Sequence, residues 1–284
     1  MGFIGGGYCD ADWIDTQFSE AGNTGVGCGL ITWALARSPH VLTQVLGRAP
    51  RAIFLSFGDP APFAGQIKQA NTALICQVQT LRDAKHAADV GADVIVAQGA
   101  EAGGHGEKRA TMTLVPEVAD FLAIHHPGTL LVAAGGIADG RGLAAALMLG
   151  ADGVLVGSRL WATSEALVGE DMLRAALNAS GDDTIRSTVM DVARALDWPA
   201  RYTCRVLQNA FTDRWHNDLN GLLENAKAEA ATWRAAWERG DPQGSNTFVG
   251  EAAGLINRIE PASDIIQRMA TEADQLLGRS WKKK

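Results

Sequence analysis

Residues 91–110 read GADVIVAQGAEAGGHGEKRA, and this stretch decides the predicted fold. An apolar run from Val94 to Ala97 ends abruptly in a glycine-rich loop that carries His105. Glycine has no Cβ, so a loop of this kind at a strand end lets the phosphate of a ligand approach the backbone closely. The stretch therefore predicts a buried strand that opens into a binding loop.

Two later apolar runs end in the same way. Leu130–Ala134 continues into Gly135 and Gly136, and Val154–Val156 continues into Gly157 and Ser158. Either loop alone could be an ordinary tight turn, but the two lie one βα unit apart. In α/β barrels phosphate often binds after the last two strands. The three strand ends together predict one phosphorylated cofactor, with His105 beside its reactive part.

Short apolar runs alternate with amphipathic helical stretches along the first part of the chain. The runs are rich in Val, Ile and Leu and do not alternate with polar residues, which is typical of strands covered on both faces. The repeat predicts βα units around a parallel sheet, in a TIM-type (β/α)8 barrel. The predicted strands are Gly2–Gly6, Val26–Thr32, Ala52–Phe57, Thr72–Val78, Asp93–Gln98, Thr129–Ala134 and Gly153–Val156.

The number of predicted strands is one short of the eight that a closed barrel of this type needs. The first run begins at residue 2, so we expect the barrel to lack its first βα unit. Gly91 and Gly150 each precede an Ala-Asp pair and a strand. They are predicted to end helices in the left-handed conformation, without a chemical role.

After Gly157 the pattern changes to helical periodicity. Residues 160–240 show no convincing strand, and Asp213–Arg239 is predicted as one long helix whose tryptophans face the core. A second helical region is expected from Gly250 to Leu277. The chain is therefore predicted to divide into a barrel with the cofactor site (1–164) and a helical cap packed on it (165–284).

Composition excludes several kinds of partner. The 284 residues are 47% hydrophobic and 20% charged, which is ordinary for a globular protein, and the net charge is −7. This balance argues against nucleic acid or an anionic membrane surface as the main partner. The basic run at 282–284 is predicted to be a solvated chain end. We find no leader and no apolar segment long enough to span a membrane, and we expect a cytoplasmic protein.

The four cysteines are scattered, without a CxxC pair or a spacing suited to zinc. Buried reduced thiols are the expectation, and no metal site is predicted.

Three segments of the chain, taken in order, resemble the nitronate monooxygenase family, formerly called 2-nitropropane dioxygenases. They are Ala97–His105, Ala133–Gly140 and Leu155–Arg159, and residues 55–60 and 250–256 add to the likeness. The resemblance covers essentially the whole chain. It implies an FMN-dependent barrel with a helical cap that oxidises alkyl nitronates, derived from nitroalkanes, with O2 to a carbonyl compound and nitrite.

The resemblance also implies individual roles. It gives His105 as the catalytic residue and places the flavin contacts on Gln77, Gln98, Gly103, Gly104, Gly135, Gly136, Leu155, Val156, Gly157 and Ser158. The chain departs from the family at Gly29, where relatives commonly have an asparagine near the flavin. It also begins after the Ala-Pro-Met-like segment with which relatives touch the cofactor.

His105 is the only histidine of six that lies among glycines at a strand end. A neutral imidazole could take the α-proton of a nitroalkane, whereas a protonated one could hold a nitronate anion. Both roles need the same position, so the sequence leaves them open, along with a surface histidine in a flexible loop. Glu101 could orient the imidazole, cap the next helix or face solvent. Arg141 is expected to pair with Asp139.

Two other functions stay open from the sequence. One is an NAD(P)H-dependent flavin reductase of quinones or enoyl thioesters, since related barrels share these loops. The other is a non-catalytic remnant that lacks the first βα unit. The expected partners are a small nitronate and O2, and the sequence leaves a homodimer open.

Overall fold

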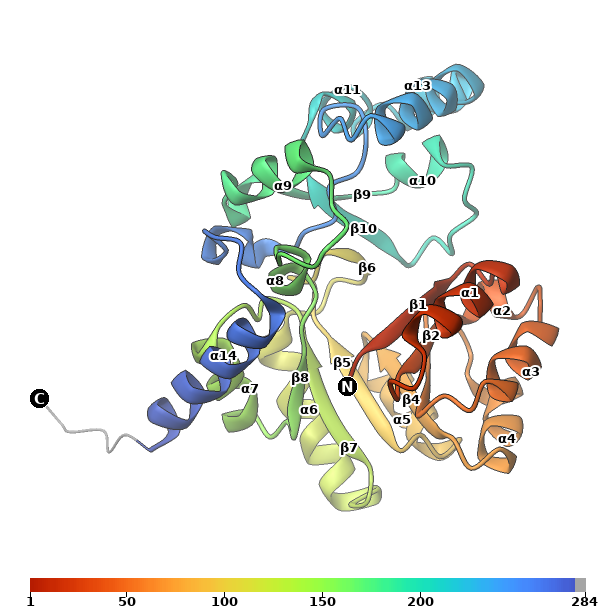
Figure 1. Cartoon of the computed structure of the whole chain (residues 1–284), viewed down its shortest axis with the longest axis vertical. Helices are drawn as coiled ribbons and strands as arrows, with labels where there is room; N and C mark the ends of the chain where they lie inside the picture. The colour runs from red at the N-terminus through yellow and green to blue at the C-terminus, as the bar shows by residue number, and fades with distance from the viewer. Residues whose placement is uncertain (279–284) are drawn as a thin grey trace, which may run out of the picture. The chain divides into compact units, whose positions relative to one another are not determined.

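The computed structural model describes residues 1–278, so the predicted basic end at 282–284 lies outside the described residues. The chain forms two compact units (Figure 1). The first unit contains residues 1–98, 113–133 and 150–152, and the second contains 99–112, 134–149 and the residues from 153 onward. The predicted division of the chain at residue 164 stays a prediction.

The main sheet has seven strands, in the order β1-β2-β3-β4-β5-β7-β8. Each registered pair from β1 to β5 is parallel. This succession of parallel strands in chain order, with helices between them, confirms the predicted TIM-type class and strand number. The strands are β1 (Phe3–Gly7), β2 (Gly27–Ile31), β3 (Ala52–Ser56), β4 (Ala73–Val78), β5 (Val94–Gln98), β7 (Leu130–Ala134) and β8 (Gly153–Leu155).

Helices connect these strands in the first unit, and α1, α3 and α4 lie together on one side of them (Figure 1). Side chains such as Ile53, Leu74 and Ile95 have no exposed surface, as expected for strands of a parallel sheet covered on both faces. The helices are α1 (Ala11–Ala21), α2 (Thr32–Leu35), α3 (His40–Gly47), α4 (Ala61–Gln69), α5 (Leu81–Asp89) and α6 (Thr111–His125).

The repeated Gly-Ala-Asp segment has a clear structural role. Gly91 and Gly150 have φ of 83° and 95°, which confirms their predicted left-handed conformation. The Asp93 carboxylate accepts a hydrogen bond from Leu74 N–H at 2.7 Å, and that of Asp152 accepts one from Leu131 N–H at 2.8 Å. The segment therefore ends a helix and ties the next strand to its neighbour.

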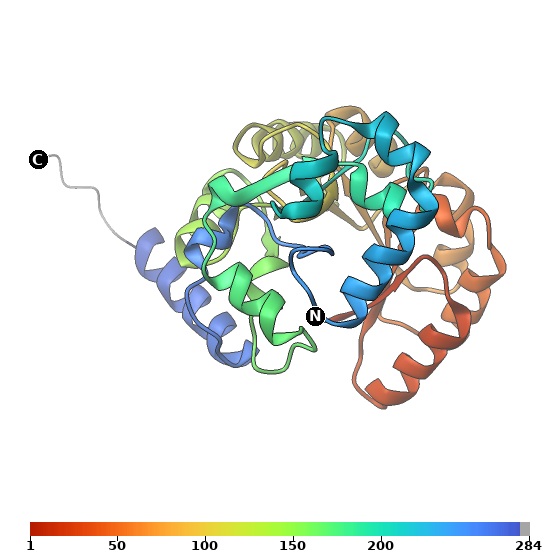
Figure 2. The ribbon, with the colours of Figure 1, turned by 90° about the horizontal axis from the view of Figure 1, so that it is seen from above.

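In the second unit, α7 (Gly140–Met148) packs closely against α14 (Ala262–Leu277) (Figure 2). A Cβ added to Gly140 would lie 2.2 Å from Glu272 Cβ. Gly140 N–H also donates to the Glu272 carboxylate at 3.1 Å. Only glycine allows the two backbones this approach.

The prediction that residues 160–240 lack strands is wrong. β9 (Thr184–Ser187) and β10 (Thr203–Leu207) form an antiparallel sheet with β6 (Gly104–Gly106), with β10 in the middle. In β10, Cys204 and Val206 are fully buried and Arg205 between them is not. This alternation is the period of a strand, but it is too short to stand out among helices.

The long helix predicted over 213–239 is also wrong, because three helices replace it. They are α11 (Ala210–Trp215), α12 (Leu219–Glu224) and α13 (Ala226–Glu238). The Asp218 side chain accepts from Gly221 N–H and starts α12 after a break. The predicted apolar face is divided: Trp215 and Leu222 lie in the core, whereas Trp237 is 44% exposed.

The second predicted helical region is likewise broken. A 3-10 turn, η2 (Glu251–Leu255), precedes α14, which begins after Pro261. The other helices of this unit are α8 (Ser158–Trp161), α9 (Glu170–Leu177), η1 (Gly181–Asp183) and α10 (Val189–Ala193).

All four cysteines are free and buried, which confirms that expectation. Between residues 1 and 278, no helix is both long and apolar enough to cross a bilayer.

Candidate active site

Three glutamines form a hydrogen-bonded cluster at the carboxyl ends of β4 and β5, in the first unit. Gln98 Oε1 accepts from Gln77 Nε2 at 3.0 Å and from Gln79 Nε2 at 2.8 Å. The carboxyl ends of barrel strands are where ligands bind in this fold. The sequence prediction included Gln77 and Gln98 but missed Gln79, which is 2% exposed and directly follows the last residue of β4.

The predicted phosphate loops lie in the second unit. Gly135 and Gly136 have φ of 107° and 74°, a conformation that favours glycine. Within the described part of this unit, no acceptor takes the backbone N–H of Gly135, Gly136, Gly157 or Ser158. A Cβ added to Gly157 would meet nothing within 4 Å. The loops thus offer backbone donors and open space, which is what a phosphate monoester requires.

Ser158 begins α8 directly after Gly157. Its hydroxyl oxygen accepts from Gly250 N–H at 2.9 Å. A hydroxyl carries one proton besides its acceptor lone pairs, so this contact is compatible with Ser158 donating to an anion. Leu155 and Val156, which complete the loop, are half-buried.

Different structural constraints favour glycine at positions 103 and 104. A Cβ on Gly103 would lie 2.6 Å from the Val249 carbonyl carbon and 2.7 Å from Gly250 N. Its small size is therefore already required by packing within the protein. Gly104 has φ of 75° and leads into β6.

His105 lies in β6, paired with Cys204 of β10, and not in a flexible surface loop. Its side chain is buried, and Nε2 lies 3.0 and 2.9 Å from Asp191 Oδ1 and Oδ2. The indole of Trp198 stacks on the imidazole, with centroids 3.4 Å apart and planes 6° apart. The sequence gave no sign of either partner, because Asp191 is 86 residues away along the chain.

The charge state of His105 results from opposing influences. Burial lowers the pKa of His105 below its ordinary value of 6.5, and the hydrogen bond and charge of Asp191 act against this. The positive charges of Arg194 and Arg186 lower the pKa further. The net lowering favours a neutral imidazole near pH 7.

Glu101 does not orient the imidazole. Its carboxylate accepts from Thr111 N–H at 3.0 Å and from Thr111 Oγ1 at 2.9 Å, at the start of α6. Of the three roles that the sequence left open, the structure supports the helix cap. Thr111 Oγ1 also lies 3.1 Å from Gly135 O, so Glu101 and Thr111 brace the Gly135 loop.

Two half-buried arginines hold the loop that leads to His105. Arg186 Nε and Arg205 Nε both donate to Ala100 O, at 3.1 and 3.0 Å, and Arg186 Nη2 donates to Ala102 O. Burial lowers the pKa of Arg186 to about 10. The Arg186 guanidinium therefore stays charged near neutral pH, and both arginines fix the loop through its carbonyls.

A pocket of about 320 Å³ adjoins the Gly135 loop within the second unit. Its polar lining includes the carboxylates of Glu101 and Glu251, and α7 and η2 supply apolar residues. The residues that line it are Glu101, Thr111, Met112, Gly135, Gly136, Ile137, Gly142, Ala145, Ala146, Leu149, Glu251, Ala252 and Leu255.

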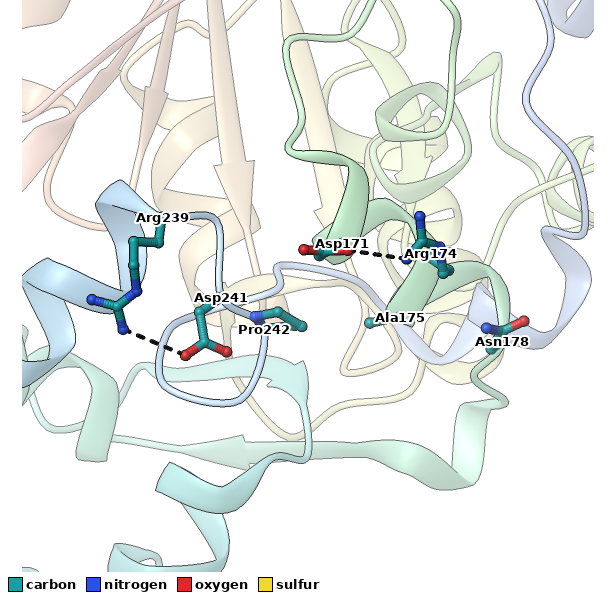
Figure 3. Close-up of a pocket in the computed structure, with 7 residues that line it drawn as sticks. All are labelled: Asp171, Arg174, Ala175, Asn178, Arg239, Asp241 and Pro242. Carbon is teal, nitrogen blue, oxygen red and sulfur yellow. Dashed lines mark hydrogen bonds and ion pairs between the residues drawn. The ribbon is translucent and has the colours of Figure 1, made fainter.

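A second pocket, of about 490 Å³, contains none of the predicted site residues (Figure 3). Its charged side chains form two ion pairs, Asp171 with Arg174 at 3.1 Å and Asp241 with Arg239 at 3.8 Å. Each arginine is thus offset by a carboxylate, and the pocket offers no uncompensated charge of its own to a ligand. Arg141 similarly pairs with Asp139 at 2.6 Å, as predicted.

A family model and several relatives are similar to this chain over most of its length. The sequence model described as "Nitronate monooxygenase" matches residues 32–272. Nitronate monooxygenase of Neurospora crassa is 37% identical over 276 residues, which cover 88% of this chain and 72% of the relative. An indene-carboxyl-CoA dehydrogenase of Mycobacterium tuberculosis is 40% identical over 239 residues, with coverage of 73% and 67%. The structure of FabK from Thermotoga maritima superimposes with a TM-score of 0.83 at 26% identity, covering 98% of this chain and 86% of FabK.

Proposed function

This chain belongs to the nitronate monooxygenase family of flavin-dependent oxidoreductases, and we propose that it oxidises an alkyl nitronate with O2 to a carbonyl compound and nitrite, with FMN as its cofactor. The observation that carries the proposal is the pairing, within one compact unit, of a buried histidine with glycine loops whose N–H groups have no acceptor among residues 1–278.

The loops fit the phosphate of FMN. The N–H groups of Gly135, Gly136, Gly157 and Ser158 would donate to its oxygens, and the Ser158 hydroxyl would add one further donor. A monophosphate needs several such donors, and no side chain fills the space over Gly157. Gly103, Gly104, Leu155 and Val156 would complete this side of the site.

The amides of Gln77 and Gln98 are proposed to contact the ring system. Gln98 uses its carbonyl oxygen to bind both neighbouring amides. Its NH2 group is proposed to donate to a carbonyl group of the flavin. When FMN is bound, it would accept electrons from the substrate.

His105 is proposed to act as a neutral imidazole on the parent nitroalkane, because a nitronate has already lost its α-proton. Its lowered pKa supports the removal of an α-proton from a nitroalkane more than the permanent holding of an anion as imidazolium. Its burial beside Trp198 keeps the ring away from bulk water. Both features suit a general base that works on a small, partly apolar molecule.

The proposal is tested by steady-state O2 uptake with a short alkyl nitronate and with the parent nitroalkane, using FMN-loaded protein. Nitrite formed in proportion to O2 consumed is the expected result. Protein that binds FMN but consumes no O2 with either compound would contradict the proposed reaction.

A second candidate reaction has one specific observation in its favour. The relative at 40% identity is named for a carboxyl-CoA substrate, so a reductase or dehydrogenase acting on a CoA thioester remains a competing function. Oxidation of NADH or NADPH by a quinone or an enoyl-CoA, faster than nitronate-dependent O2 uptake, would favour it. Purified protein without flavin absorbance, and unable to bind added FMN, would favour a non-catalytic remnant.

A further inference from the structure

The contact between His105 and Asp191 is the basis of a further inference, which rests on the proposed role of His105. We infer that Asp191 is a positioning residue that fixes the tautomer and the ring plane of His105, so that Nδ1 is the nitrogen that exchanges a proton with the substrate.

The hydrogen bond decides the tautomer. Nε2 lies 2.9–3.0 Å from both carboxylate oxygens of Asp191. An ionised carboxylate can only accept, so Nε2 must carry the proton in this contact. A neutral imidazole protonated at Nε2 has its lone pair on Nδ1. The proton acceptor of the proposed base is therefore Nδ1.

Burial makes this contact specific. Asp191 and His105 are 3% and 8% exposed, so water cannot replace either partner at little cost. Removing a carboxylate from water without giving it a hydrogen-bond donor is strongly unfavourable. This cost keeps the Nε2–H directed at Asp191.

The fold brings the two residues together through the three-stranded sheet. Cys204 in β10 is paired with His105 on one side and with Ser187 of β9 on the other. The chain leaves β9 at Ser187 and enters α10 two residues later, which places Asp191 in the first turn of that helix. Asp191 thus lies on α10, which follows β9, and β10 is the one strand between β9 and the β6 strand of His105.

Trp198 restricts the ring in a second way. It follows α10 in the chain and lies parallel to the imidazole at 3.4 Å. A ring held at its edge by Asp191 and on its face by Trp198 cannot rotate without breaking one of the contacts. The imidazole is therefore set in one plane before any substrate arrives, which is the geometric requirement of proton transfer.

Asp191 also sets how basic His105 is. The charged and titratable groups around the ring are Asp191 on α10, Arg194 at the end of α10, Arg186 on β9 and Cys204 on β10. Burial raises the pKa of the Cys204 thiol, so Cys204 stays neutral. Asp191 raises the pKa of His105, against burial and the two arginines. Removing its charge should lower the pKa of His105 further.

The direct test is the nitrogen NMR spectrum of protein labelled at histidine, with His105→Asn used to assign the His105 signals. The expected result in the unchanged protein is a neutral ring at pH 7 with the proton on Nε2. A proton on Nδ1 would overturn the inference. This measurement needs neither flavin nor substrate, so it stands even if the nitronate reaction proves wrong.

Kinetics of Asp191→Asn with the nitroalkane as substrate give the second readout. An amide can donate as well as accept, so it no longer enforces one tautomer. We expect kcat to fall at least about 10-fold with little change in KM, and the acidic limb of the pH profile to move to lower pH. An unchanged pH profile would overturn the inference.

Glu229→Gln is the matched control. Glu229 is a buried carboxylate of the same unit, bonded to Trp215 Nε1 at 3.3 Å, and it has no contact with His105. Its variant should keep the wild-type pH profile even if it is less stable. Should Asp191→Asn fail to fold, the tautomer in the unchanged protein still decides the matter.

Discussion

Replacing Gly157 by valine should abolish tight FMN binding while leaving the fold intact. Gly157 has φ of −106°, which any residue can adopt, and a Cβ there would meet no atom within 4 Å. The protein itself therefore does not need glycine at this position. If the phosphate binds here, the valine side chain occupies the space that its oxygens require.

The size of the effect follows from the donors lost. Displacing the phosphate from the N–H groups of Gly157 and Ser158 removes two hydrogen bonds to a charged group, worth about 1.5–3 kcal/mol each. The binding free energy should fall by about 3–6 kcal/mol, which corresponds to an increase in Kd of about 10²–10⁴-fold.

The assay is titration of flavin-free protein with FMN, followed by flavin fluorescence, alongside thermal unfolding without flavin. Gly47→Val is the control, because a Cβ at Gly47 also meets nothing within 4 Å and the residue lies at the end of α3. We expect Tm of Gly157→Val to stay close to that of the wild type while its affinity is lost. Unchanged FMN affinity in Gly157→Val would mean that the phosphate binds elsewhere.

Three further outcomes are expected. His105→Asn should retain FMN and lower turnover by about 10²–10⁴-fold, measured by O2 uptake; equal turnover removes His105 from the mechanism. Because the pKa of His105 is lowered in the fold, the unfolded chain binds more protons below pH 6.5. The neutral ring's contribution to stability is thus complete above about pH 6.5 and is lost as pH falls through the lowered pKa. Denaturant unfolding should show this loss in the wild type and not in His105→Asn, and parallel pH dependences would contradict it. Gly140→Ala should reduce the unfolding free energy by about 1–3 kcal/mol, because its Cβ would lie 2.2 Å from Glu272 Cβ; an unchanged denaturation midpoint would show that α7 and α14 can separate freely.

Much of the first half of the chain could be predicted from its residues because its signals are local. An apolar run that ends in glycine indicates a buried strand from a few neighbouring residues. Gly91 and Gly150 likewise indicate helix ends by their position before an Ala-Asp pair. Glycine loops that expose N–H groups are also a local property, so Gly135 and Gly157 could be singled out without a structure.

The errors fall where long-range packing overrides local pattern. Residues 203–207 become a strand because β6 and β9 flank them on both sides, and five residues of alternation cannot outweigh helical surroundings in the sequence. The predicted helix over 213–239 is broken at Asp218 and Asn225, polar residues that satisfy backbone groups locally. Such breaks depend on which face of each segment finds a core to pack on.

The order of residues was enough to predict the class of fold, the glycine loops and His105 as the candidate catalytic histidine. The contacts that hold His105 became known from the three-dimensional fold alone. Asp191 and Trp198 lie far from His105 along the chain, and their contacts exist because three short strands pair across that distance. A hydrogen bond and a stacked ring depend on distance and orientation in space, and neither can be recognised from the amino-acid sequence.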